Sequence, residues 1–262
     1  MLALILSVAL WGGVLAQTDT VVLRGHPQVV HVYGQRGSGD PVIVSSGDGG
    51  WIHLGPQVAE TLAARGFFVI GFNVKAYLSS FTTGGGVVRE ADVPGDYRAL
   101  VDYAARGSPA ATGSPKKPIL IGVSEGAGLS VLAATDPVTQ RRVAGVIALG
   151  LPDLNELGWR WKDSLIYVTH GVPNEPTFSA AAIVGSLAPL PFAAIHSTRD
   201  EFVPESEIRR VMARANEPKR LRMVNASDHR FSGNVEEFDR TLLESIEWVR
   251  LNQTQPQWNV LR

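Results

Sequence analysis

The sequence predicts a single α/β domain built on a mainly parallel β-sheet with helices on both faces. Short runs of β-branched residues alternate with amphipathic helical stretches, as in chains of βα units whose sheet is buried on both sides. The 262 residues, 45 % of them hydrophobic, can fill one large core. Glycine-rich turns follow several of the strand-like runs, which is typical of tight connections between strands and helices.

The sheet is expected to open with an antiparallel pair, because residues 20–23 and 29–33 are too close in sequence for a parallel crossover. The later runs are short and almost wholly apolar, which indicates strands that are buried on both faces. In chain order these further strands are 42–45, 67–72, 119–123, 146–149, 192–195 and 221–224.

Amphipathic helices are predicted where apolar residues recur at helical spacing. They cover residues 54–64, which end before Gly66, then 96–105, and finally 236–251. The segment 151–190 is longer than one crossover requires. It is either a small cap over a pocket or an extra strand and helix packed at the sheet edge.

Residues 1–16 are predicted to be a cleaved signal peptide. They are uninterrupted apolar and small residues, too few for a membrane helix of about 20 residues, and they end in Val14-Leu15-Ala16. Residues 17–262 would form the mature domain, exported by a bacterium to the periplasm or secreted, with no further run of membrane-span length. Because no Lys or Arg precedes the apolar run, a buried first element or an uncleaved anchor is the alternative.

Composition excludes several classes of function. Lys and Arg number 24 and Asp and Glu 25, so the net charge of −1 provides no overall basic field for nucleic acid. The absence of cysteine excludes disulfides, thiolate catalysis and cysteine-ligated metal sites. We therefore expect no nucleic-acid partner, no cofactor and no metal.

Ser124 is the candidate nucleophile, in the pattern G-x-S-x-G formed by residues 122–126. The pattern stands directly after an apolar strand and directly before a small-residue helical stretch. Its glycines allow the sharp turn that raises a serine Oγ above a sheet in a strained conformation. A serine N-cap in a glycine-rich turn is the alternative, but it would not require an acid and a histidine further along the chain.

Both partners follow in the order expected for a serine hydrolase on a parallel sheet. Asp200 comes shortly after the strand 192–195, and His229 shortly after the strand 221–224. His229 would take the proton from Ser124 Oγ, and Asp200 would orient the imidazole and stabilise its cation.

Other residues near these positions are rivals or neighbours. Glu201 is the alternative acid, and Asp228 is expected to be a loop residue. His196, His170 and His53 do not follow the last strand, and a structural role is expected for them.

Ester hydrolysis also requires N–H donors for the oxyanion of the tetrahedral intermediate. The backbone N–H of Glu125, next after the nucleophile, is one candidate. The second is expected from the glycine turn 47–50, at Asp48 or alternatively at Gly49. A phosphate-binding loop is the other interpretation, but this turn lacks the Lys-Ser/Thr of a P-loop and the spacing of a dinucleotide fingerprint.

Together these residues resemble the α/β-hydrolase superfamily over nearly the whole mature chain. More specifically, the chain is similar to the bacterial virulence-protein VirJ family, which includes the VirJ-like domain of AcvB. The residues that carry this similarity are Ser46-Gly47-Asp48-Gly49-Gly50-Trp51, Gly71-Phe72, Tyr77, the serine turn and the His229-Arg230-Phe231 ending. The family's serine turn usually has aromatic flanks, where this chain has Val123 and Glu125.

The resemblance implies an exported serine hydrolase that releases the amino acid from aminoacyl-phosphatidylglycerol, a membrane lipid. Within the matching motif, Trp51 is expected to contact the substrate. One hypothesis is that Asp48 and Glu125 place two carboxylates beside the nucleophile, favouring an ester with a cationic amine such as lysyl-phosphatidylglycerol. The alternative is that both side chains point away and only their backbones serve.

The sequence thus predicts a metal-free serine hydrolase that cleaves carboxylic esters through an acyl-enzyme. A general small-ester esterase or an acyl transferase is a second interpretation. A third is a catalytically silent protein of the same fold that acts as a periplasmic binding or virulence and secretion accessory factor. An intact set of Ser124, Asp200 and His229 argues against the third.

Overall fold

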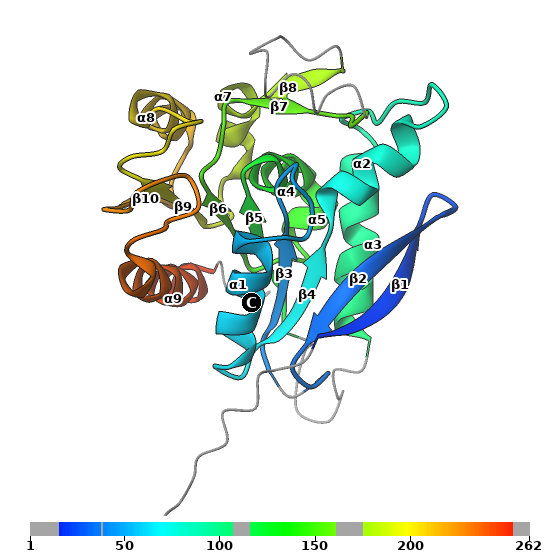
Figure 1. The fold of residues 1–262 in the computed structure, drawn as a ribbon, viewed down its shortest axis with the longest axis horizontal. Helices are drawn as coiled ribbons and strands as arrows, with labels where there is room; N and C mark the ends of the chain where they lie inside the picture. The colour runs from blue at the N-terminus through cyan, green and yellow to red at the C-terminus, as the bar shows by residue number, and fades with distance from the viewer. Residues whose placement is uncertain (1–15, 38, 107–115, 161–174, 254–262) are drawn as a thin grey trace, which may run out of the picture.

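A computed structural model of the chain describes residues 16–37, 39–106, 116–160 and 175–253. Within them, eight strands form one sheet in the order β1-β2-β4-β3-β5-β6-β9-β10 (Figure 1). The strands are β1 (Gln17–Leu23), β2 (His26–Tyr33), β3 (Pro41–Ser45), β4 (Phe68–Phe72), β5 (Ile119–Val123), β6 (Gly145–Leu149), β9 (Phe192–Ser197) and β10 (Lys219–Val224).

The strand directions agree with the sequence pattern. β2 pairs antiparallel with β1 and with β4, whereas β4, β3, β5, β6, β9 and β10 run parallel to one another. β3, β4, β5 and β6 are buried at every position, as expected for strands covered on both faces. The predicted α/β-hydrolase fold class is confirmed.

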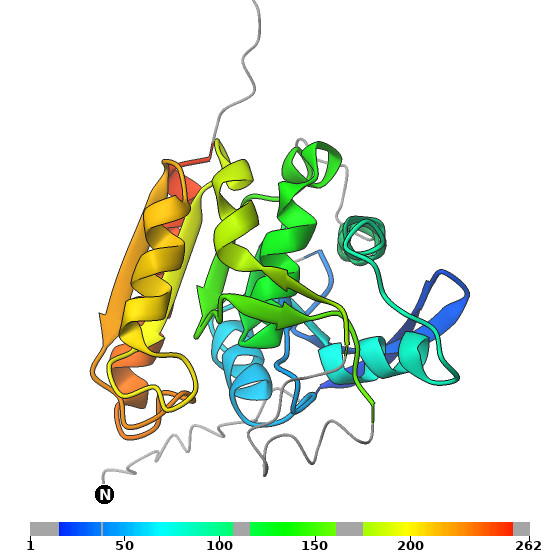
Figure 2. The same cartoon turned by 90° about the horizontal axis from the view of Figure 1, so that it is seen from above.

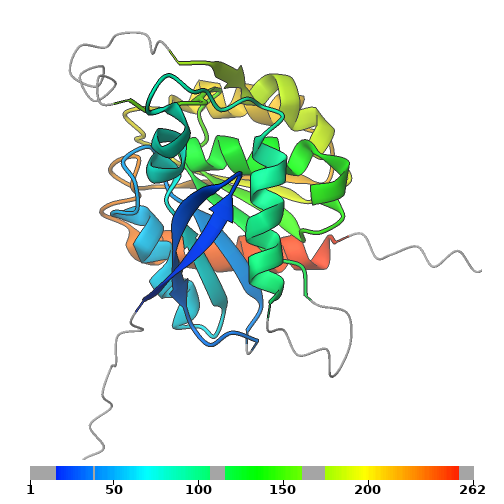
Figure 3. The same ribbon diagram turned by 90° about the vertical axis from the view of Figure 1, so that its right-hand side faces the viewer.

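Helices cover both faces of the sheet. α1 (Leu54–Ala63) and α9 (Val235–Leu251) bury their apolar sides against one face. α2 (Val74–Thr82), α3 (Val93–Ala105), α4 (Glu125–Thr135) and α8 (Glu205–Arg214) cover the other. Figure 3 shows α3 beside the β1–β2 ribbon. The short α5 (Pro137–Gln140), α7 (Ala180–Ile183) and 3-10 helix η3 (Val184–Leu187) pack on α4.

Two of these helices, α2 and α8, do not stand out in the sequence. α8 buries only Ile208, Val211 and Met212, and its other residues apart from Ala213 are charged or polar, so its apolar stripe is narrow. α2 begins at Asn73, whose side chain accepts a hydrogen bond from the N–H of Ala76. The helix therefore depends on a capping interaction as well as on its apolar side chains.

The described part of the segment 151–190 forms a small layer of its own. β7 (Leu154–Glu156) and β8 (Thr177–Ser179) pair antiparallel in a separate two-stranded sheet, so neither joins the main sheet. Both strands lie above α4 in Figure 1, and they are therefore on the side nearer the viewer in Figure 2. Residues 161–174 lie outside the described residues, and the role of this segment as a cap stays a prediction.

The predicted signal peptide, apart from Ala16, also lies outside the described residues. Among the residues that are described, no helix combines the length and the apolar character needed to cross a bilayer.

Candidate active site

Ser124 occupies the sharp turn between β5 and α4. Its backbone has φ 51° and ψ −118°, a strained conformation for a residue with a Cβ. A Cβ added to Gly122 would lie 2.2 Å from the carbonyl oxygen of Gly126, and one added to Gly126 would lie 2.3 Å from that of Ser46. The backbones therefore approach so closely that both glycines of the motif are required.

The surroundings of Ser124 come from three strands. The Ser124 N–H donates to the carbonyl of Leu149 at the end of β6, at 2.8 Å. A Cβ on Gly47, which follows β3, would lie 3.4 Å from Ser124 Cβ. The serine turn lies at the carboxyl end of β5. Loops that follow the other parallel strands can therefore reach it.

Asp200 and His229 are brought together from the loops after β9 and β10. His229 Nδ1 lies 2.6 Å from Asp200 Oδ2, and the Asp200 side chain is only 1 % exposed. The other oxygen, Oδ1, accepts hydrogen bonds from the N–H groups of Phe202 and Val203 at 3.0 and 2.8 Å. Burial alone would raise the pKa of Asp200, but His229 and these N–H groups together hold it below its ordinary value.

The His229 ring packs on Gly150, which follows β6. A Cβ on Gly150 would lie 2.6 Å from His229 Cε1, so the imidazole packs directly on this residue. Gly150 follows Leu149, whose carbonyl binds the Ser124 N–H, and its φ is 60°. Gly150 was not among the predicted site residues. The only feature of the sequence that could have indicated its role is that a glycine follows the predicted strand 146–149.

Within the described residues, no hydrogen bond joins His229 to Ser124 Oγ. Such contacts are often long without substrate and tighten when it binds.

Glu201, the rival acid, contacts a different part of the histidine. Its Oε2 accepts a hydrogen bond from the His229 backbone N–H at 2.7 Å. Asp200 thus contacts the ring of His229, and the adjacent Glu201 contacts its main chain. This geometry favours Asp200 as the partner of the imidazole.

Two backbone segments offer N–H groups near Ser124. Glu125 is the first residue of α4, so its N–H has no carbonyl partner within the helix. In the 47–50 turn, the Gly49 N–H donates to Asp48 Oδ1 at 2.9 Å. Gly49 is therefore already engaged, and Asp48 is the better candidate of the two for a second donor.

The carboxyl groups beside Ser124 are not equivalent. Glu125 is buried, and its Oε1 accepts a hydrogen bond from the Glu156 N–H of β7 at 2.5 Å. Burial, Glu156 and Asp48 raise the pKa of Glu125 well above its ordinary value, which disfavours its charged form. Burial also raises the pKa of the half-buried Asp48, while the Gly49 N–H, His229 and Lys75 oppose the shift. Asp48 is thus the more accessible of the two carboxyl groups.

Trp51 packs on the sheet at a distance from the serine strand. A Cβ on Gly71 of β4 would lie 2.2 Å from the indole, which also stacks on His31 at 5.0 Å and donates to Tyr33 Oη. β3 separates β4 from the serine strand β5. These contacts are those of a packing residue, and a contact of Trp51 with substrate stays a prediction.

Apolar side chains are exposed beside the candidate catalytic groups. Phe202 is 62 % exposed and presents an edge-to-face contact to the His229 ring, with centroids 5.5 Å apart. Ile52 is also exposed and lies 3.6 Å from the position of a Cβ on Gly49. Neither residue was identified in the sequence.

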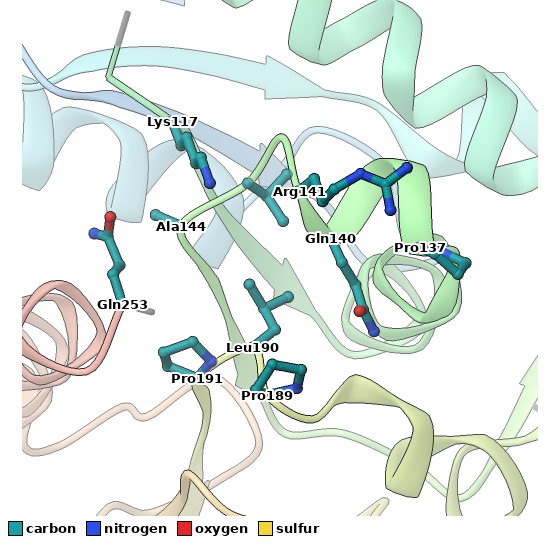
Figure 4. A pocket seen from close by; sticks show the side chains of 10 residues that line it. Lys117, Pro137, Gln140, Arg141, Ala144, Pro189, Leu190, Pro191 and Gln253 are labelled. Carbon is teal, nitrogen blue, oxygen red and sulfur yellow. The ribbon is translucent and has the colours of Figure 1, made fainter. Parts of the chain in front are cut away.

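A surface pocket of about 420 Å³ lies elsewhere (Figure 4). Lys117, Ala144 and Pro191, which line it, stand just before β5, β6 and β9. The pocket is therefore at the amino ends of the strands, opposite the serine turn, and contains none of the predicted site residues. Over the described part of the chain, no group of three or more His, Asp or Glu side chains is placed to hold a metal ion.

Comparison with known proteins agrees with this architecture. The profile of the family described as "Bacterial virulence protein (VirJ)" matches residues 40–156, which include the glycine turn and the serine turn. No curated protein matches the chain in sequence.

Solved structures that share the fold include an esterase from Pyrococcus furiosus, with a TM-score of 0.66, 17 % identity and 90 % of each chain covered. Est1E from Butyrivibrio proteoclasticus has a TM-score of 0.62 and 15 % identity, covering 88 % of this chain and 99 % of that one. A dienelactone hydrolase from Anabaena variabilis has a TM-score of 0.62 and 14 % identity, covering 92 % and 100 %. At such identities these similarities establish the fold alone.

Proposed function

We propose that this chain, which has the α/β-hydrolase fold and resembles the VirJ family over residues 40–156, is a serine-dependent carboxylic ester hydrolase. The observation that carries the proposal is the buried hydrogen bond between His229 and Asp200, with the imidazole packed on Gly150 beside the strained Ser124 turn. A glycine-rich turn alone would not require a histidine and an acid from two later strands.

In the proposed reaction, Ser124 Oγ attacks the ester carbonyl carbon while His229 Nε2 takes the hydroxyl proton. The negative charge moves to the carbonyl oxygen, which the N–H groups of Glu125 and Asp48 stabilise. The C–O bond then breaks, and the alcohol leaves with the proton from His229. Water, deprotonated by the same imidazole, attacks the acyl-enzyme, releasing the carboxylic acid and restoring Ser124.

The charges around His229 suit this proton transfer. Asp200 is bonded to Nδ1, which leaves Nε2 for the serine. The lowered pKa of Asp200 keeps its carboxylate ionised, so it stabilises the imidazolium formed during attack. Glu201 holds the backbone of the same histidine.

A fluorophosphonate probe tests the reaction class. Covalent labelling is expected in the wild-type protein and should be absent in Ser124→Ala, because the probe phosphonylates an activated serine. Labelling should persist in Ser206→Ala, which changes an exposed serine of α8. A folded wild-type protein that is not labelled would contradict the proposal and favour a catalytically silent binding or accessory protein.

The resemblance to VirJ supports a finer proposal, that the substrate is an aminoacyl ester of phosphatidylglycerol met by the exported protein in the periplasm. Release of an amino acid from this lipid is hydrolysis of a carboxylic ester, which needs no other chemistry. Burial raises the pKa of Asp48, and the charges of His229 and Lys75 oppose this shift. If Asp48 is ionised in the complex, it attracts the ammonium group of a lysyl ester.

Selectivity tests this substrate. Wild-type protein should prefer lysyl-phosphatidylglycerol to a neutral short-chain ester in kcat/KM, and Asp48→Asn should reduce that preference about 10-fold. Glu125→Gln should change this preference little, because the Glu125 side chain is buried and its Oε1 is bonded to the Glu156 N–H. An unchanged preference in Asp48→Asn would contradict the role of charge, and failure to release lysine from the lipid would contradict the substrate.

A further inference from the structure

His196 is a buried histidine that the proposed reaction does not use. It belongs to β9, lies on the same face as Phe192 and Ala194, and is 0 % exposed. Its Nε2 lies 3.0 Å from the carbonyl oxygen of Val203, while its Nδ1 is buried with no hydrogen-bond partner. Because a carbonyl can only accept, Nε2 carries the proton and donates it.

This hydrogen bond acts on the turn that contains Asp200. The N–H of Val203 donates to Asp200 Oδ1 at 2.8 Å, and the carbonyl of the same residue accepts from His196. Val203 is thus held on both sides, by the acid and by the buried histidine. His196 Nε2 also lies 4.0 Å from Asp200 Oδ2, the oxygen that binds His229 Nδ1.

We propose that His196 is a positioning residue for the catalytic acid, fixing the 200–203 turn through Val203 so that Asp200 Oδ2 meets the His229 ring. The proposal rests on the ester hydrolase function above. It follows from the placement of one N–H donor, which binds the Val203 carbonyl of the turn and lies 4.0 Å from Asp200 Oδ2.

The surroundings of His196 favour the neutral ring that this role requires. Burial lowers its pKa, outweighing the opposing effects of Asp200, the Val203 carbonyl and Glu205 of α8, and His229 lowers it further. A neutral ring with its proton on Nε2 can donate to Val203 without placing a second positive charge beside Asp200. His196 therefore leaves the Asp200 carboxylate free to stabilise the cation of His229.

Paired substitutions separate the donor from the bulk of the side chain. His196→Phe keeps a ring but removes the N–H group, and His196→Gln keeps an N–H donor near the position of Nε2. Ile195→Ala, on the opposite face of the same strand, is the control for loss of core packing. Stability of each variant is measured by urea unfolding alongside activity.

His196→Phe is expected to lower kcat by about 10- to 100-fold with little change in KM, because small misplacements of catalytic groups cost this much. In the same variant, the acidic limb of the pH profile of kcat/KM should also shift along the pH axis. His196→Gln should recover at least part of kcat. Equal losses in both variants and in Ile195→Ala would show a packing role only and overturn the proposal.

Nuclear magnetic resonance provides two readouts that need no substrate, and the first of them needs no variant. In wild-type protein, nitrogen shifts should show His196 as the neutral Nε2–H tautomer; a charged ring or the Nδ1–H tautomer would overturn the proposal. The short Asp200–His229 bond should give a far-downfield proton signal, which should weaken in His196→Phe and persist in Ile195→Ala. Because these signals do not depend on turnover, they test His196 even if no ester is hydrolysed.

Discussion

Ser124→Ala is expected to lower kcat for ester hydrolysis by about 10⁵- to 10⁶-fold, as when one member of a catalytic unit is removed. The loss is large because Ser124 carries the only hydroxyl of the serine turn, residues 122–126, so the acyl-enzyme cannot form without it. Alanine retains the Cβ and the strained φ of 51°, so the stability of the fold should be close to that of wild type.

Turnover of a p-nitrophenyl ester, with urea unfolding of the same samples, measures this prediction. Ser206→Ala in α8 is the matched control and should keep wild-type kcat. Activity in Ser124→Ala within about 10-fold of wild type would exclude Ser124 as the nucleophile, since loss of the nucleophile costs orders of magnitude more.

Asp200→Asn should have the second largest effect, lowering kcat by about 10⁴-fold. An amide in place of the carboxylate that lies 2.6 Å from His229 Nδ1 favours the wrong tautomer and no longer stabilises the imidazolium. KM should change little, because Asp200 is buried behind the histidine and 1 % exposed.

Glu201→Gln is the decisive comparison for Asp200→Asn. The Glu201 carboxylate accepts a hydrogen bond from a backbone N–H of His229, and an amide oxygen can accept the same bond. The kcat of Glu201→Gln should therefore fall by less than about 10-fold, which is the effect expected when one hydrogen bond is weakened by loss of charge. A larger loss in Glu201→Gln than in Asp200→Asn would make Glu201 the catalytic acid.

The local features of the site were predictable because they depend on residues close together in sequence. The strand 119–123, the serine turn and the order of Ser124, Asp200 and His229 all follow from runs of a few residues. Gly122 and Gly126 illustrate the reason: their role is set by backbone approaches within and beside one turn. The antiparallel pair and parallel strands also follow from short-range patterns and connection lengths.

Contacts between distant segments could not be predicted in this way. Asp200 and Glu201 are adjacent in sequence, and Asp200 was preferred without any knowledge of the geometry. In the structure, the turn after β9 directs Asp200 to the ring of His229 and Glu201 to its backbone. Trp51 was assigned to the substrate from its motif, and only the structure shows that its indole fills the space over Gly71. The contact of Glu201 with the His229 backbone and the packing of Trp51 over Gly71 cannot be read from residues that are neighbours in sequence.

The sequence by itself determined the fold class, the serine turn and the candidate residues, because hydrophobic periodicity and glycine placement act over a single strand or turn. Only the tertiary structure decided that Gly150 supports the His229 ring, that Glu125 is buried under β7 and that His196 holds the Asp200 turn. Each of these depends on the packing of strands and loops that are far apart in the chain. Packing of that kind fixes distances and burial, and through them the charge states on which the proposed chemistry depends.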